Sequence, residues 1–126
     1  MPQKYTATHT LTYSASTVDL IEIAAPSTRA VRITGVMVGQ DSDDATSESE
    51  MLPITIQRAS ASGSGGTVLT AGKIEAGFAT AASTVEGGNT TGATLSTPVL
   101  VYDSFNVLSG WRWVGDGLAR GWLAPG

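Results

Sequence analysis

Alternation with a period of two residues is the feature that most limits how this chain can fold. From residue 4 to residue 13, aromatic and apolar residues and His9 alternate with threonines. This pattern is typical of a half-buried β-strand, because successive side chains point to opposite faces and threonine suits the wetter face. The N-terminal segment is therefore expected to be a strand.

Short alternating or apolar segments recur along the chain and are separated by glycine, proline and serine. Besides residues 4–13, strands are expected in residues 18–23, 28–40, 52–56, 67–70 and 95–102, with another short element around residues 73–78. No window combines a helical period with a cap and enough length. The pattern predicts an all-β fold, a single β-sandwich or jelly-roll-like domain over residues 1–126 with long polar loops.

Residues 28–40 contain a shift in the alternation. Val31 and Ile33 have one parity, whereas Val36 and Val38 have the other, and Gly35 lies at the switch. A one-residue β-bulge at Gly35 would return all four side chains to one buried face. With a strained backbone at this glycine, Gly35→Val should cost about 1–3 kcal/mol of stability.

Two segments are expected to be loops. Residues 60–66 are rich in glycine and serine and predict a flexible turn. Residues 79–94 are small and polar with no periodicity, and a loop of that length is usually functional, here as a subunit contact. The final Pro125-Gly126 is a turn signal, which indicates that closing strands are missing or that a neighbouring subunit covers the edge.

Composition narrows the class of protein. Charged residues make up only 14% of the chain, well below the usual quarter, which fits either a protein-contacting surface or an ordinary threonine-rich β-domain. The net charge of −4 argues against nucleic-acid binding. No apolar run reaches the length of a membrane span, and no apolar segment of a signal peptide follows Met1. Synthesis in the cytoplasm is expected.

The sequence contains few side chains of the kinds that catalyse reactions or bind zinc. There is no cysteine, and His9 is the only histidine, so neither a thiol nucleophile nor a zinc site has its ligands. No Gly-x-Ser-x-Gly motif supports a catalytic triad. We therefore expect a non-catalytic protein without metal or cofactor, in which His9 is structural.

Five acidic residues between positions 41 and 50 account for the net negative charge of the chain. They are Asp41, Asp43, Asp44, Glu48 and Glu50. They are expected to form a solvated loop, and the alternatives are a calcium site or a docking loop for a basic patch on a partner. The spacing lacks the glycine and the final glutamate of an EF-hand loop.

Aromatic residues gather near the C-terminus. The candidate contact residues are Phe105, Trp111, Trp113 and Trp122. They either fill one end of the core or form an aromatic contact surface, because tryptophan is enriched at interface hot spots. A platform on which carbohydrate rings stack is the minor variant of the contact-surface hypothesis.

The segment over residues 102–114 contains Phe-Asn-Val-x-x-Gly-Trp-x-Trp. It resembles a segment of small virion structural proteins of tailed bacteriophages, and the matching residues are Phe105, Asn106, Val107, Gly110, Trp111 and Trp113. The resemblance implies a capsid decoration or minor capsid protein with a β-sandwich fold, located in the virion and bound to the major capsid protein or to neighbouring subunits, with homo-oligomers expected. It implies no catalytic residue, and neither nucleic acid nor membrane is an expected partner. The alternatives are a tail-fibre or carbohydrate- and receptor-binding module that uses the tryptophans, and an accessory domain of a hydrolase.

Overall fold

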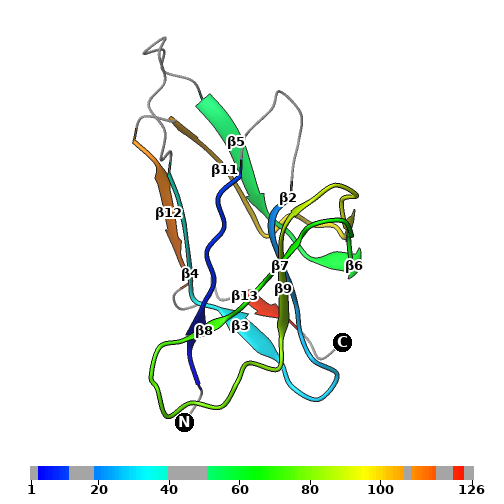
Figure 1. Cartoon of the computed structure of the whole chain (residues 1–126). Helices are drawn as coiled ribbons and strands as arrows, with labels where there is room; N and C mark the ends of the chain where they lie inside the picture. Colours follow the sequence, from blue (N-terminus) through cyan, green and yellow to red (C-terminus); the bar gives the residue numbers. More distant parts are fainter. Residues whose placement is uncertain (1–2, 12–18, 40–50, 107–108, 116–120, 124–126) are drawn as a thin grey trace. The chain divides into compact units, whose positions relative to one another are not determined.

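The computed structural model describes residues 3–11, 19–39, 51–106, 109–115 and 121–123. In this part the chain is all-β, as the alternation predicted, and consists of several small sheets (Figure 1). Every strand pair whose register is defined is antiparallel. The described residues contain no helix that is long and apolar enough to cross a membrane.

The chain divides into two compact units, each built from segments that are distant in sequence. Unit 1 comprises Met1–Val31, Ala59–Leu95 and Leu123–Gly126, and unit 2 comprises Arg32–Arg58 and Ser96–Trp122. Strand β3 (Val31–Ile33) pairs with β13 (Gly121–Leu123). The two units are described separately.

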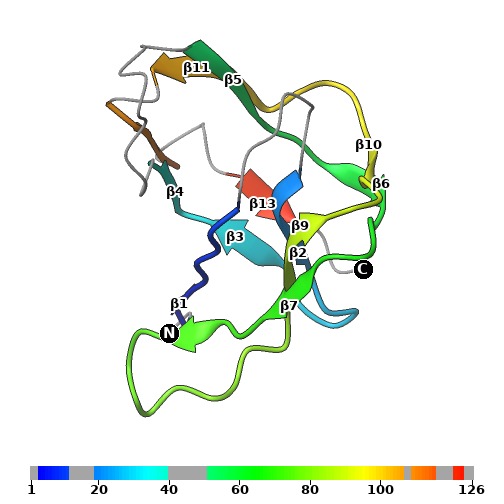
Figure 2. The same cartoon turned by 45° about the horizontal axis from the view of Figure 1, so that its top comes forward.

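Unit 1 is organised around a three-stranded sheet. Its order is β2 (Asp19–Ala24), β9 (Thr84–Asn89) and β7 (Thr67–Leu69), and Figure 2 shows the central position of β9. Strands β2 and β7 lie where the alternation placed them. Val85 in β9 is 3% exposed and is the most buried hydrophobic residue of the described chain.

The prediction that residues 79–94 form a loop is wrong, because β9 is the central strand of this sheet. Val85, Gly87 and Asn89 are buried, and the residues between them are more exposed. A Cβ built on Gly87 would lie 2.6 Å from Cδ2 of His9, so the imidazole ring occupies the space of the missing side chain. Strand β9 was not predicted because Gly87, which packs under the His9 ring, stands at an inner position where an apolar side chain would be expected.

The flexible turn predicted at residues 60–66 is found in part: residues 62–66 connect two strands, but an isolated bridge at Ser64 holds them. Strand β6 (Ala59–Ala61) pairs with β10 (Thr94–Leu95), and Ser64 exchanges two backbone hydrogen bonds of 3.0 Å with Thr91. A Cβ on Gly66 would lie 2.7 Å from the Gly87 carbonyl oxygen. Glycine is needed here for close backbone approach rather than for flexibility.

The N-terminal alternation is confirmed in burial, although the strand is shorter than expected. Only β1 (Tyr5–Thr6) pairs, with β8 (Gly72–Lys73). From residue 5 to residue 11, half-buried residues alternate with exposed threonines. The Tyr5 hydroxyl donates to the Ala79 carbonyl at 2.8 Å.

Unit 2 contains two further antiparallel pairs. Strand β5 (Met51–Ile56) pairs with β11 (Val101–Asn106), and β4 (Gly35–Val38) pairs with β12 (Trp111–Val114). Ile54 in β5 is 8% exposed and is the buried hydrophobic residue of this unit. The segment predicted as one strand at residues 95–102 is divided: Leu95 ends β10, Pro98 lies in the break, and β11 begins at Val101.

The shift in the alternation of half-buried and exposed residues near Gly35 is present, but it coincides with a break in the strand at Thr34. All four residues expected on the buried face are half-buried, and the strand breaks at Thr34 between β3 and β4. Gly35 is not among the glycines with positive φ, and a Cβ on it would approach only the Trp113 carbonyl oxygen, at 3.4 Å. The backbone strain behind the expected loss of about 1–3 kcal/mol is therefore absent.

Candidate functional site

Two of the candidate tryptophans lie on one face of β12. Trp111 is directly opposite Val38 and Trp113 is directly opposite Val36, and all four are half-buried. This face of the β4–β12 pair is therefore the inner one. Both tryptophans therefore share a half-buried face with aliphatic cross-strand neighbours, an arrangement that agrees with the core-filling hypothesis.

The other aromatic candidates are less closely placed. Phe105 is half-buried in β11, opposite Leu52. Trp122 belongs to β13, and its side chain lies outside the described part, as do Val107 and the acidic residues 41–50.

A hydrogen bond joins β12 to β11 within unit 2. The Trp111 indole nitrogen Nε1 donates to Oδ2 of Asp103 at 3.0 Å, and the Ser104 backbone nitrogen donates to Oδ1 at 2.8 Å. These donors, with the indole first, hold the pKa of the exposed Asp103 carboxyl below its usual value. The bond fixes the indole orientation, because an indole can only donate.

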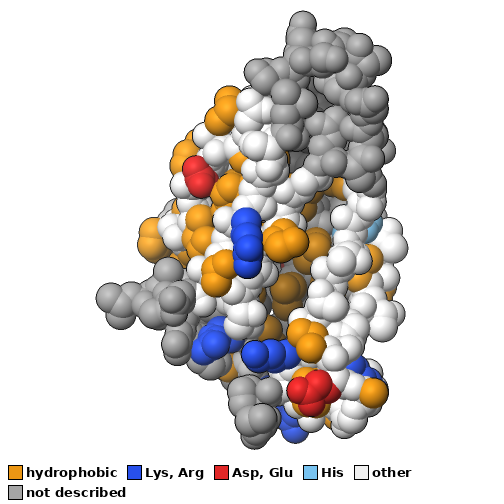
Figure 3. All heavy atoms as spheres, turned by 90° about the vertical axis from the view of Figure 1, so that its left-hand side faces the viewer, with side chains coloured by type: hydrophobic (Ala, Val, Ile, Leu, Met, Phe, Trp, Pro, Cys, Tyr) orange, Lys and Arg blue, Asp and Glu red, His pale blue; other side chains and the backbone are white. Residues whose placement is uncertain are grey.

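The outer faces of both strand pairs carry exposed hydrophobic side chains. On β4–β12, Met37 is 77% exposed, and Val114 and Arg112 are also exposed. On β5–β11, Tyr102 and Met51 are exposed. Figure 3 faces the side of Figure 1 on which β12 and β4 are drawn, and hydrophobic side chains, in orange, are visible on that side.

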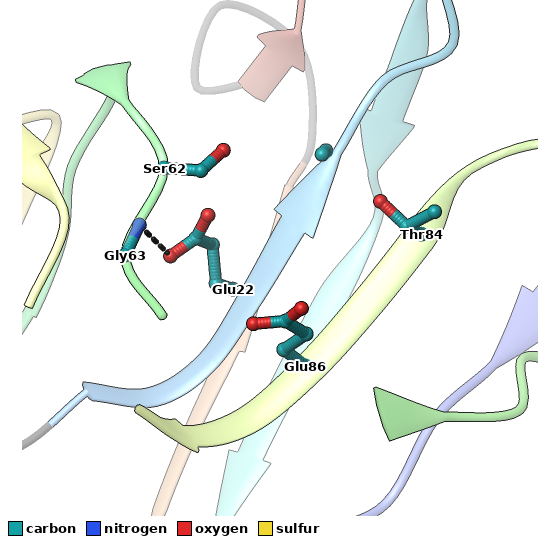
Figure 4. A pocket seen from close by; sticks show the side chains of 6 residues that line it. Glu22, Ser62, Gly63, Thr84 and Glu86 are labelled. Atoms are coloured by element: carbon teal, nitrogen blue, oxygen red, sulfur yellow. Dashed lines mark hydrogen bonds between the residues drawn. The ribbon is translucent and has the colours of Figure 1, made fainter. Parts of the chain in front are cut away.

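A shallow pocket lies on the three-stranded sheet of unit 1 (Figure 4). Its volume of about 50 Å³ is far below that of a small-molecule site. Its lining residues are Glu22, Ala24, Ser62, Gly63, Thr84 and Glu86. Oε2 of Glu22 accepts hydrogen bonds from the Gly63 backbone nitrogen at 2.9 Å and from Nδ2 of Asn89 at 2.8 Å.

Sequence reasoning missed this acidic pair because it assigned residues 79–94 to a loop. Glu22 and Glu86 are direct partners across β2 and β9, and Val68 of β7 is opposite Glu86. The overlooked signal was the parity of residues 84–89. Buried Asn89 holds Glu22 through its amide nitrogen, whereas its Oδ1 has no hydrogen-bond partner among the described residues.

Within the described ranges, no group of three or more His, Asp or Glu side chains could hold a metal ion. Asn89-Thr90-Thr91, an acceptor pattern for glycosylation, begins with a buried residue. Comparisons with models of known protein families, with curated proteins and with solved structures found no match.

Proposed function

We propose that this chain is a structural protein of a tailed-bacteriophage virion, a non-catalytic capsid decoration or minor capsid protein that acts by contact with other virion proteins. The observation that carries the proposal is the exposure of large hydrophobic side chains on small sheets. Eleven are exposed in the described part, eight of them in strands, whereas the buried hydrophobic residues there are Ile54 and Val85.

Sheets of this size need a partner surface. A two-stranded pair is only marginally stable in water, and clustered exposed hydrophobic residues mark interaction sites. Because few residues are charged, close contact with another virion protein would bury few unpaired charges. In this proposal the small sheets pack as a β-sandwich, and the virion lattice covers their outer faces.

The resemblance to phage structural proteins supports the proposal independently of burial. Of its residues, Phe105 lies in β11 and Trp111 and Trp113 lie in β12, and these three are half-buried. In this setting they hold the fold together, and the exposed residues on the opposite face, such as Tyr102, meet the partner.

The test combines copy number with binding. Purified particles should contain the chain in high copy number, and the purified chain should co-sediment with capsids stripped of it. Tyr102→Lys should abolish co-sedimentation, because it places a charge on the outer face of β5–β11. Ile74→Lys, which changes an exposed residue of unit 1, is the matched control and should still bind.

The tail-fibre alternative predicts different results. A compact monomer that fails to bind stripped capsids but binds a glycan array, with binding lost in Trp111→Ala or Trp122→Ala, would replace the capsid proposal. The half-buried setting of Trp111 beside Val38 does not favour a flat stacking platform.

A further inference from the structure

One sheet face in unit 2 combines a cation with exposed hydrophobic residues. On the outer face of β4–β12, Met37 and Arg112 are direct cross-strand partners, and Val114 follows Arg112 on the same face. All three are exposed, and neither strand contains an acidic residue. Methionine and arginine are enriched in protein interfaces. These three residues are called the cationic face.

One sheet face in unit 1 has the opposite charge. Val68, Glu86 and Glu22 form a row across β7, β9 and β2, with Val68 75% exposed. None of these strands contains a basic residue. Figure 4 shows the Glu22 and Glu86 side chains extending to the same side of the sheet, beside Ser62. These three residues are called the acidic face.

The acidic face is unfavourable when it stands alone. Like charges directly opposite in a ladder destabilise a sheet, and Glu22 and Glu86 are directly opposite. A cation placed above both carboxylates would turn this repulsion into attraction. The hydrogen bonds from Gly63 and Asn89 satisfy only Oε2 of Glu22.

The two faces match in the order and spacing of their side chains. Neighbouring strands lie about 4.8 Å apart, so Met37 is as far from Arg112 as Val68 is from Glu86. When Met37 lies on Val68, the guanidinium of Arg112 falls over Glu86 and Glu22. Both contacts are then made at once, apolar on apolar and cation on carboxylates.

We infer that a second copy of this chain docks its cationic face on the acidic face of the first. The inference deepens the proposed function, on which it rests, by naming one partner and the two surfaces. The interface is heterologous, because different surfaces meet, so each copy in a chain of copies leaves one face free for the next.

Charge reversal tests the inference in the purified full-length chain by sedimentation velocity at low and high salt. The wild-type chain should self-associate, and salt should weaken the association because it screens the ion pairs. Arg112→Glu and Glu86→Arg should each weaken it about tenfold or more. Arg58→Glu and Glu75→Arg, which reverse exposed charges elsewhere, are the matched controls and should associate as the wild type does.

Mixing the two reversed variants gives the sharpest result. Arg112→Glu keeps an intact acidic face and Glu86→Arg keeps an intact cationic face, so a 1:1 mixture restores the wild-type junction between the two variants. The mixture should associate more tightly than either variant alone, because only the mixture contains that junction. Circular dichroism of each variant verifies that it is folded.

A wild-type chain that stays monomeric at low salt would overturn the inference, as would folded Arg112→Glu protein that associates like the wild type. Capsid co-sedimentation separates this failure from failure of the proposed function. Binding to stripped capsids without charge-dependent self-association refutes the inference and leaves the proposed function standing. Self-association without binding to capsids refutes the proposed function and leaves the inference standing.

Discussion

The packing of His9 on Gly87 predicts that one added methyl group will disrupt unit 1. Gly87 is buried in the central strand β9, directly opposite Ile21 of β2 and Thr67 of β7. Gly87→Ala would place a Cβ 2.6 Å from Cδ2 and 2.8 Å from Nδ1 of His9, with Cγ closer still. Carbon atoms in favourable contact are about 3.5–4.0 Å apart, so the ring must move by about 1 Å.

The nearest atom is Cγ of the imidazole, which rotation about χ2 does not move, so relief of the clash requires another χ1 rotamer or a shift of the backbone. Overpacking of this kind costs typically about 1–3 kcal/mol, and we expect Gly87→Ala to lie in that range. His9→Ala removes the obstructing ring. Gly87→Ala should therefore cost less than about 0.5 kcal/mol in a His9→Ala background, which gives a coupling of roughly 0.5–3 kcal/mol between the two sites.

Urea unfolding followed by far-ultraviolet circular dichroism measures the four free energies of this double-mutant cycle. Gly77→Ala is the control, because it is an exposed glycine with no atom within 4 Å of the added Cβ. Equal losses from Gly87→Ala with and without the His9 ring would refute the reasoning, and so would a Gly87→Ala variant as stable as Gly77→Ala.

Three further outcomes are expected. Asn89→Asp should destabilise the fold by about 1–3 kcal/mol at neutral pH, because it replaces the amide that donates to Glu22 with a buried carboxylate, and acid should reduce the loss in urea unfolding. Trp111→Phe removes the indole donor and should raise the pKa of Asp103 in a carboxyl NMR titration. Since the folded-state pKa is depressed, the stabilisation is present above the unfolded-state value and is lost below about pH 4, and an unchanged pKa would contradict the assigned bond. Thermal unfolding should not respond to excess chelator, whereas a drop of several degrees in the midpoint would favour the calcium hypothesis for residues 41–50.

The sequence by itself determined the class of fold and the strands whose inner positions are aliphatic. Strand β5 is the clearest case, because Leu52, Ile54 and Ile56 alternate with exposed residues as predicted. The same logic located β2 and β7 and the shift of parity near Thr34. These predictions succeed because an apolar side chain at every second position has one stable solution, a strand with one covered face.

Tertiary structure decided the role of the glycines and the position of the acidic pair. Gly87 and Gly66 look like loop residues in the sequence, yet one lies under the His9 ring and the other against the backbone of β9. Glu22 and Glu86 are 64 positions apart in the sequence and meet only because β9 pairs with β2. The physical reason is the same in both cases. Neither a glycine nor a charge distant in sequence produces a local sequence pattern, so its structural role depends on the segment that packs against it in the folded chain.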